Sequence, residues 1–428
     1  MSSECHDPLE ALPFEVAKII FEQLRMQDLV ICLSVSKSWK NLLESMTKLW
    51  TTVITTDTCQ PITLKDLRSY LRVSNYGVSS ALVDLKFFED ESNAKYLMKT
   101  CHQLQDIRIS GEDQFTTLHA ASLAKGSGIQ KLYFSPKTIV DVPTMISSLE
   151  ACKNTIVEAD FLCLIEKRSP SKFPWPKMSA LRSIHLHFRQ RCELELSGLI
   201  DATPNIRSFM IYRAYIRDKL RLDMTQWSNL ETLDLKKTKL RIFPKLPSSL
   251  KRLILEKNYG ITFRSNDDNG NYSLPLLETL SIQQNRVEVS TIGEITKSSI
   301  QANKLKTLLC GCLGSETKAR VKAHEYFPPS SSLEELSLEQ LNIGDRDILS
   351  IARLYPRLKK INISQTGVSL KGFQELVDIG IKSINIDGCL TVHPRYVMEA
   401  IEKGVDVSMK SMNNHYWMGN NIVKLVPG

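Results

Sequence analysis

One short apolar pattern recurs along most of this chain and limits the folds open to it. The pattern is Leu-x-x-Leu-x-Leu, with other aliphatic, aromatic or small apolar residues allowed at the three fixed places. Thirteen copies begin at residues 82, 104, 129, 156, 181, 206, 230, 250, 277, 305, 333, 358 and 381, so successive copies lie 20 to 28 residues apart. A steady period of this size indicates a stack of similar structural units.

Each unit in such a stack supplies one short parallel strand and a return segment, and it buries its apolar face only against its neighbours. The spacing is typical of leucine-rich repeats. Helical returns are expected over 344–356 and 369–380, whereas the prolines in 169–180 and 245–249 favour irregular ones. The predicted fold is therefore α/β, a solenoid with parallel strands on its concave face.

The repeat also predicts polar side chains that hold the turn after each strand. The position eight residues after the first Leu prefers Asn or Cys, which hydrogen-bond the turn backbone. Asn258, Asn285 and Cys389 occupy it, whereas Thr238 and Thr366 stand there in other copies. The repeats therefore vary in the residue at this position but keep its spacing from the first Leu.

A separate apolar module precedes the repeats. The stretch "LPFEVAKIIFEQLRMQDLVICLSVSKSWKNLLESMTKLW" spans residues 12–50, and its apolar spacing predicts three short helices. So short a segment rarely forms an adequate core alone. We expect its surplus apolar surface, at Leu12, Pro13, Ile20, Trp39 and Trp50, to pack on the following domain or on a partner protein.

This module resembles an F-box. The resemblance rests on a set of residues at the family's spacing: Leu12, Pro13, Glu15, Ile20, Phe21, Leu24, Leu29, Val35, Trp39, Leu49 and Trp50. Two features depart from the family: Ser38 stands before Trp39 where a basic residue is common, and "LVICL" is unusually apolar. The resemblance covers about a tenth of the chain. It implies that these residues bind a SKP-type adaptor and, through it, the cullin and RING subunits of a ubiquitin ligase.

The chain divides into four parts on this interpretation. They are an F-box over 8–50, a connecting helical linker over 51–80, a solenoid of about 13 repeats over 81–410 and a capping tail over 411–428. The stretch "TLKDLRSYLRVS" is expected to be the linker helix. Tyr416, Trp417 and Met418 in the tail are expected to cover the open end of the solenoid.

The residues between the pattern leucines should face outward along the concave surface. The candidates for substrate binding there are Arg108, Lys131, Tyr133, His185, His187, Met210, Tyr212, Lys236, Arg252 and Glu256. Tyr, Met and Arg are residue types that anchor protein interfaces. The same face also fits an ordinary solvated surface of mixed charge. His185 and His187 alone make a weak metal site, so no metal is expected.

Several functional classes lack support in the sequence. There is no phosphate-binding Gly-x-x-x-x-Gly-Lys loop and no nucleophile elbow, so we expect neither catalysis nor a cofactor. The ten cysteines lack zinc-ligand spacing and a disulfide framework, which indicates a reducing compartment. No secretory signal and no membrane-length apolar run is present, so a soluble protein of the nucleus or cytoplasm without membrane contact is expected.

Together with the repeats, the resemblance to an F-box implies a non-catalytic substrate receptor of a ubiquitin ligase. Residues 383–401, "SINIDGCLTVHPRYVMEAI", are similar to fungal F-box/leucine-rich-repeat receptors that act on the replicative helicase during replisome disassembly. That resemblance implies a nuclear protein with a helicase subunit as substrate, although such receptors usually carry an N-terminal tetratricopeptide region and this chain begins at the F-box.

Three alternatives remain open. One is an F-box scaffold without a ligase. Another is a basic nucleic-acid or chromatin-binding solenoid, suggested by the formal charge of +8, although direct nucleic-acid contact is not expected from the spacing of basic and aromatic residues. The third is a solenoid that holds a small-molecule co-ligand.

Overall fold

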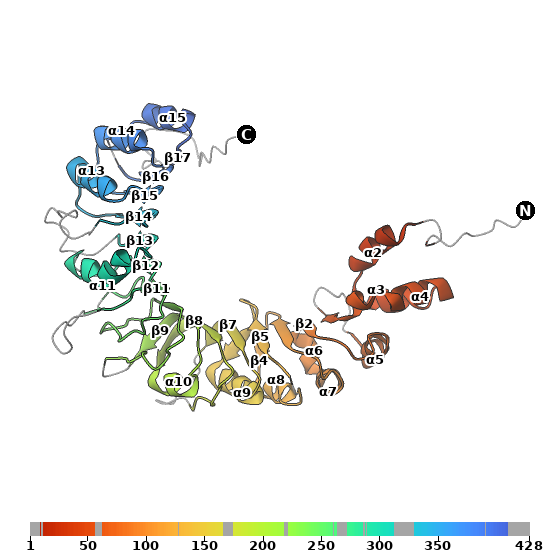
Figure 1. The fold of residues 1–428 in the computed structure, drawn as a ribbon. Helices are drawn as coiled ribbons and strands as arrows, with labels where there is room; N and C mark the ends of the chain where they lie inside the picture. Colours follow the sequence, from red (N-terminus) through yellow and green to blue (C-terminus); the bar gives the residue numbers. More distant parts are fainter. Residues whose placement is uncertain are drawn as a thin grey trace, which may run out of the picture. The chain divides into compact units, whose positions relative to one another are not determined.

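The computed structural model describes residues 9, 12–55, 62–126, 128–165, 174–217, 221–259, 261–262, 272–285, 287, 289–311, 329–389 and 391–409 (Figure 1). The predicted capping tail lies outside the described residues. The chain forms two compact units. Unit 1 comprises Met1–Cys192 with Asp201–Ile206, and unit 2 comprises Glu193–Ile200 with Arg207–Gly428.

Unit 1 begins with the three short helices that the apolar spacing predicts. They are α2 (Phe14–Glu22), α3 (Met26–Cys32) and α4 (Lys37–Ser45), followed by the 3-10 turn η1 (Thr47–Trp50). Ser36 caps α4, because its hydroxyl accepts a hydrogen bond from the Trp39 backbone N–H at 3.1 Å. Helix α5 (Leu64–Val73) follows as the predicted linker helix, and Thr63 and Asp66 form a capping box at its start.

Parallel strands form the rest of unit 1. They are β1 (Thr52–Ile54), β2 (Ser80–Asp84), β3 (Asp106–Ser110), β5 (Lys131–Phe134), β7 (Glu158–Ile165) and β8 (Ser183–Leu194), each paired with the next, beside the short strands β4 (Gln114–Phe115) and β6 (Ile139–Asp141). The return segments hold α6 (Leu85–Glu89), α7 (Glu91–Thr100), α8 (Thr117–Leu123) and α9 (Val142–Cys152), and α10 (Ser197–Ala202) follows β8. Figure 1 shows α7, α8 and α9 along one side of the strands.

The first predicted repeat is placed wrongly by the sequence pattern. The pattern expects Leu82, Leu85 and Phe87 to point inward from one strand. In the structure Ala81 pairs with Ile107, the inward residue of β3, and Leu85 begins helix α6. The inward residues of β2 are therefore Ala81 and Val83, both buried. The pattern misses Ala81 because its side chain carries little apolar surface, and it takes Leu85 of the following helix as a strand residue.

Unit 2 repeats the strand-and-return pattern more regularly. Its parallel strands are β9 (Ser208–Ile216), β10 (Thr232–Lys236), β11 (Arg252–Ile254), β12 (Thr279–Ser281), β13 (Thr307–Leu309), β14 (Glu335–Ser337), β15 (Lys360–Asn362), β16 (Ser383–Asn385) and β17 (Asp406–Ser408). Its described helices are α11 (Val289–Gln301), α13 (Asp345–Leu354), α14 (Leu370–Ile379) and α15 (Pro394–Glu402). The helical returns predicted over 344–356 and 369–380 are confirmed. Gly380 ends α14 with a left-handed φ of 96°, a conformation that glycine adopts without a side-chain clash.

Buried asparagines hold the turns of unit 2, as the repeat predicts. The Asn258 Nδ2 donates to the carbonyl oxygens of Leu235 and Leu255 at 2.6 and 2.9 Å. Its Oδ1 accepts from the Thr238 N–H at 2.8 Å, and its own N–H donates to Asn285 Oδ1 at 2.7 Å. Each amide therefore links one repeat to the next and satisfies turn groups that burial removes from water.

Candidate functional site

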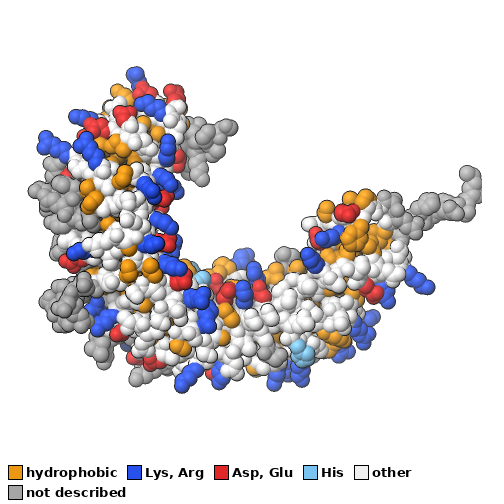
Figure 2. Space-filling view, in the orientation of Figure 1, with side chains coloured by type: hydrophobic (Ala, Val, Ile, Leu, Met, Phe, Trp, Pro, Cys, Tyr) orange, Lys and Arg blue, Asp and Glu red, His pale blue; other side chains and the backbone are white. Residues whose placement is uncertain are grey.

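An apolar surface lies uncovered on the N-terminal helices of unit 1. Six large apolar side chains there are between 40% and 63% exposed: Phe14, Val16, Ile19 and Ile20 on α2, Ile31 on α3 and Val35 after it. We call these residues the α2–α3 apolar surface. Figure 2 shows hydrophobic side chains gathered over this part of the chain. Several large apolar side chains exposed within one short segment are typical of an interaction site.

The opposite side of these helices forms a small core. Phe21 is buried and meets the Trp39 ring edge-on, with 5.5 Å between ring centroids. Trp50 is also buried, and its Nε1 donates to the Leu43 carbonyl oxygen at 2.8 Å. This core holds α2, α3 and α4 together. Val16, Ile19 and Ile20 lie on the side of α2 that faces away from this core.

The residues predicted to bind an adaptor divide between these two places. Pro13, Glu15, Ile20 and Val35 are exposed, and Leu12, Leu24, Trp39 and Leu49 are half-buried. Phe21, Leu29 and Trp50 lie in the interior, where they support the surface without forming it. Val16 and Ile19 are not among the predicted adaptor-binding residues, because helical spacing alone does not say which side of a helix faces outward.

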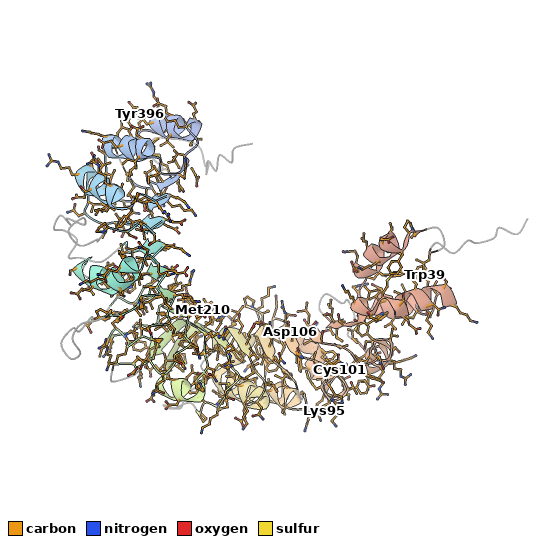
Figure 3. All side chains as sticks on the ribbon, in the orientation of Figure 1. Trp39, Lys95, Cys101, Asp106, Met210 and Tyr396 are labelled. Atoms are coloured by element: carbon orange, nitrogen blue, oxygen red, sulfur yellow. The ribbon has the colours of Figure 1, made fainter. Side chains whose placement is uncertain are left out.

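Helix α5 joins this helical module to the first strands of unit 1. The Tyr70 hydroxyl oxygen lies 2.7 Å from the Thr52 carbonyl oxygen and 2.9 Å from that of Leu49. Its ring packs against Trp50 at 5.1 Å between centroids, and burial raises the pKa of this phenol. Helix α3 packs on α5 as well. Figure 3 places the labelled Trp39 among these N-terminal helices.

The predicted binding residues of β3, β5 and β8 in unit 1 lie in one charged network. Strand register places Arg108 beside Tyr133, and the guanidinium carbon lies 5.2 Å from that ring centroid. The Tyr133 hydroxyl donates to Glu158 at 2.5 Å, and Lys131 Nζ lies 3.3 Å from the same carboxylate. Burial, then the hydrogen bond to Glu158, raises the pKa of Tyr133.

Carboxylates balance the cations of this network. Arg108 forms an ion pair with Asp106 at 3.4 Å, and His185 Nδ1 lies 3.4 Å from Asp160 Oδ2. His187 is half-buried on the same strand as His185. The sequence reasoning missed Glu158 and Asp160, although the same alternation in β7 places them on this face. Figure 3 labels Asp106 among the strands of unit 1.

The predicted residues of unit 2 form a second group on neighbouring strands. Met210 pairs with Asp234 and Tyr212 with Lys236, and both are half-buried. Lys236 forms an ion pair with Glu256, which also accepts a hydrogen bond from the Ser281 hydroxyl at 2.7 Å. Burial acts to raise the pKa of Glu256, but these hydrogen bonds outweigh it and lower the pKa. Arg252 is exposed at the start of β11.

Two searches of the described residues give negative results. None of the described helices has the length and apolar character to cross a membrane. Within the same residues, no group of three His, Cys, Asp or Glu side chains is arranged to hold a metal ion.

Comparison with known proteins matches the N-terminal module to one family. Residues 9–56 match the family model described as F-box-like. No curated protein matches the chain by sequence.

Solved structures of low identity resemble the chain more broadly. A yeast Rad7 and Elc1 complex contains a chain 13% identical, with 95% of this chain and 92% of that one covered and a TM-score of 0.35. A leucine-rich-repeat protein of Leptospira interrogans is 14% identical, with coverages of 81% and 92% and a TM-score of 0.46. TLR13 in a complex with ssRNA13 is 12% identical, with a TM-score of 0.43, and the alignment covers 79% of this chain but only 43% of TLR13.

The helical module, the family match and the stacked parallel strands describe one arrangement. An F-box-like segment at the N-terminus is followed by repeats whose apolar strand pattern and buried asparagines are those of leucine-rich repeats. The chain therefore joins an F-box-like segment to a fold of leucine-rich-repeat type.

Proposed function

We propose that this chain is the substrate-recognition subunit of an SCF-type ubiquitin ligase. Its F-box docks on a SKP-type adaptor, which connects it to cullin and the RING subunit, and its strand face binds a protein substrate. The observation that carries the proposal is the α2–α3 apolar surface, uncovered within a segment that matches the F-box-like family.

The chemistry of this surface suits a protein partner. Helix α2 buries Ala17 and Phe21 against its own module and presents Val16, Ile19 and Ile20 outward. An apolar helix face of this kind binds by entering a hydrophobic groove on another protein. The adaptor then completes a core that so short a module cannot build alone.

The strand face suits the second binding event. In each unit, neighbouring strands offer Tyr, Arg and Lys side chains, and unit 2 adds Met210; Tyr, Arg and Met are residue types enriched at protein interfaces. A receptor of this kind needs no catalytic residue of its own. It accelerates transfer by holding the substrate near the loaded conjugating enzyme at high effective concentration.

One substrate is a specific candidate. The similarity of residues 383–401 to fungal receptors active in replisome disassembly supports a subunit of the replicative helicase, and with it a nuclear location. Affinity purification from nuclear extract, read for helicase subunits, tests this candidate separately from the ligase role.

The ligase role is tested by affinity purification of the intact chain beside Leu12→Ala/Pro13→Ala, read by mass spectrometry. Leu118→Ala, which changes a highly exposed residue of α8, is the matched control. We expect adaptor and cullin to disappear from the double variant and to remain with the control, while a shared set of other proteins remains with all three. Adaptor retained by the double variant refutes the docking site. Adaptor without cullin in the intact sample identifies a scaffold that has no ligase.

A further inference from the structure

A column of equivalent residues lies at the carboxyl ends of the unit 2 strands. Strand register aligns residues 213, 237, 257, 284, 340, 365 and 388, which belong to the repeats of β9 to β12 and of β14 to β16. Each of them has a positive φ, between 53° and 74°. The repeat therefore requires a left-handed residue at this position whatever its side chain is.

The side chains in this column change along the unit. The first three members are Arg213, Lys237 and Lys257, and the later non-glycine members are Gln284, Gln340 and Gln365. Because Gln meets the same backbone requirement, the fold does not demand a cation here. The positive charge of the first three repeats is a separate property of the surface.

A second column beside the first adds aromatic rings. The same register aligns Tyr215, Lys239 and Tyr259. Lys239 Nζ lies 4.6 Å from the Tyr215 ring centroid, and Lys237 Nζ lies 5.2 Å from that of Tyr212. The column's Tyr259 is largely exposed.

The cations also change the chemistry of these phenols. The hydrogen bond with Arg241, then the charge of Lys239, lowers the pKa of Tyr215. The hydrogen bond with Lys237 outweighs burial and lowers the pKa of Tyr212. We name the whole set the basic turn surface: Tyr212, Arg213, Tyr215, Lys237, Lys239, Arg241, Lys257 and Tyr259.

Two lysines of this surface, Lys237 and Lys257, differ from other lysines of unit 2 in their ion pairing. At the opposite ends of the strands Lys251, Lys306 and Lys359 each form an ion pair with a glutamate, at 2.8 to 3.1 Å. Within the described part of the chain, no ion pair joins Lys237 or Lys257 to a carboxylate. Figure 2 shows Lys and Arg side chains along the strand side of unit 2, with Asp and Glu side chains among them.

We propose that the basic turn surface binds an acidic segment of a partner protein, with Tyr259 packing against the aliphatic parts of its side chains. This inference rests on the proposed function, since it names the class of substrate that the strand face takes. Acidic carboxylates complement lysines that form no ion pair within the described part of the chain, and such complementarity selects partners and speeds association. The anion of the segment comes from Asp and Glu clusters or from phosphoryl groups, and the experiment separates the two sources.

The extent of the charge favours a peptide over nucleic acid. Neighbouring strands lie about 4.8 Å apart, so three cationic repeats cover roughly 10 Å along the column. Beyond them the column is neutral at Gln284, and the cations of the unit 1 network are balanced by carboxylates. Proteins that track a nucleic-acid backbone need a longer continuous run of cations.

The test measures fluorescence anisotropy with the full chain and a fluorescein-labelled peptide of Asp, Glu and Gly. We expect Arg213→Gln/Lys237→Gln/Lys257→Gln to weaken binding about tenfold, from the loss of three charge contacts at the surface. Gln is chosen because the fold already uses it at this position. The control Lys251→Gln/Lys306→Gln/Lys359→Gln removes the same net charge at the other ends of the strands and should keep wild-type affinity.

Further arms identify the source of the anion and the class of ligand. A phosphoserine peptide that binds more tightly than the Asp/Glu peptide, and loses affinity in the Gln variant, supports the surface with phosphoryl groups as its anion. Equal affinity of wild type and Gln variant for both peptides overturns the proposal. The proposal is also overturned if a labelled thymidine oligonucleotide binds the wild-type chain more tightly than either peptide does and binds the Gln variant more weakly.

Adaptor binding is read on the same samples and separates this inference from the proposed function. The Gln variant should retain the adaptor, since its changes lie in unit 2, whereas an Ile19→Ala/Ile20→Ala variant should retain the peptide. Peptide binding without adaptor binding in the wild-type chain refutes the ligase role and leaves the acidic-segment surface standing. The reverse result overturns the surface alone.

Discussion

Replacing Ile19 and Ile20 by alanine should separate adaptor docking from folding. The two side chains are 60% and 46% exposed, so a partner can still remove about half of each from water. Full burial of an Ile side chain contributes about 1.5–3 kcal/mol, which makes the exposed halves worth about 1 kcal/mol each. The pair should therefore lose about 2 kcal/mol of binding free energy, or roughly 30-fold in Kd for the adaptor.

The same change should leave the fold nearly untouched. Both positions face away from the core of the F-box, and surface substitutions usually alter the free energy of unfolding by less than about 0.5 kcal/mol. Phe21→Ala is the matched contrast on the same helix, since Phe21 is buried against Trp39. Emptying a buried Phe site costs about 3–5 kcal/mol, more than so small a module has to spare.

Isothermal titration calorimetry with purified adaptor measures the binding loss, and hydrogen exchange over residues 14–50 reports local unfolding. We expect Ile19→Ala/Ile20→Ala to weaken binding with native exchange protection, and Phe21→Ala to lose both. A double variant that binds as the wild type does refutes the assignment of this surface. Loss of hydrogen-exchange protection in the double variant refutes the inference that both side chains lie outside the core of the module.

Three further predictions concern unit 2. Asn258→Ala should lower the free energy of unfolding in urea by about 3 kcal/mol, because buried turn groups lose their amide partner; a loss below about 1 kcal/mol contradicts that role. Gly311→Ala should destabilise by about 1–3 kcal/mol in thermal denaturation, since a Cβ there would lie 2.7 Å from the Glu339 carbonyl oxygen, whereas at Gly128 the nearest atom is 3.5 Å away and Ala should be tolerated. The pKa of Glu256 is lowered in the folded state, so its carboxylate stabilises the fold at pH values above the ordinary Glu pKa of about 4.3. This contribution is lost as the pH falls through the lowered pKa. Glu256→Gln should flatten this part of the stability–pH curve, and an unchanged curve argues against the contribution.

The arrangement of the repeats was predictable because apolar periodicity is local information. A side chain that recurs at Leu-x-x-Leu-x-Leu spacing must face one side of a short strand, and only stacking hides it from water. The same local logic found Asn258 and Asn285, whose amides serve the adjacent turn. It failed at β2, where Ala81 carries too little apolar surface to mark the register.

Apolar periodicity does not predict the structure of the linker or the partners of the outward-facing residues. Residues 52–54 form strand β1 because they pair in parallel with residues 80–82. The three residues of β1 do not by themselves predict that pairing. The alternation placed Arg108 and Tyr133 outward, but their carboxylate partners Glu158 and Asp160 come from another repeat.

The sequence by itself determined that this chain is a stack of apolar strands behind a small F-box-like module. Tertiary structure alone decided which side of each element meets water. It assigned Phe21 to the core and Ile19 to the surface of one helix, although both are large and apolar. It also aligned Arg213, Lys237 and Lys257 in one column. Such proximity depends on strand register between repeats that lie 20 or more residues apart, and residue spacing within one repeat does not specify it.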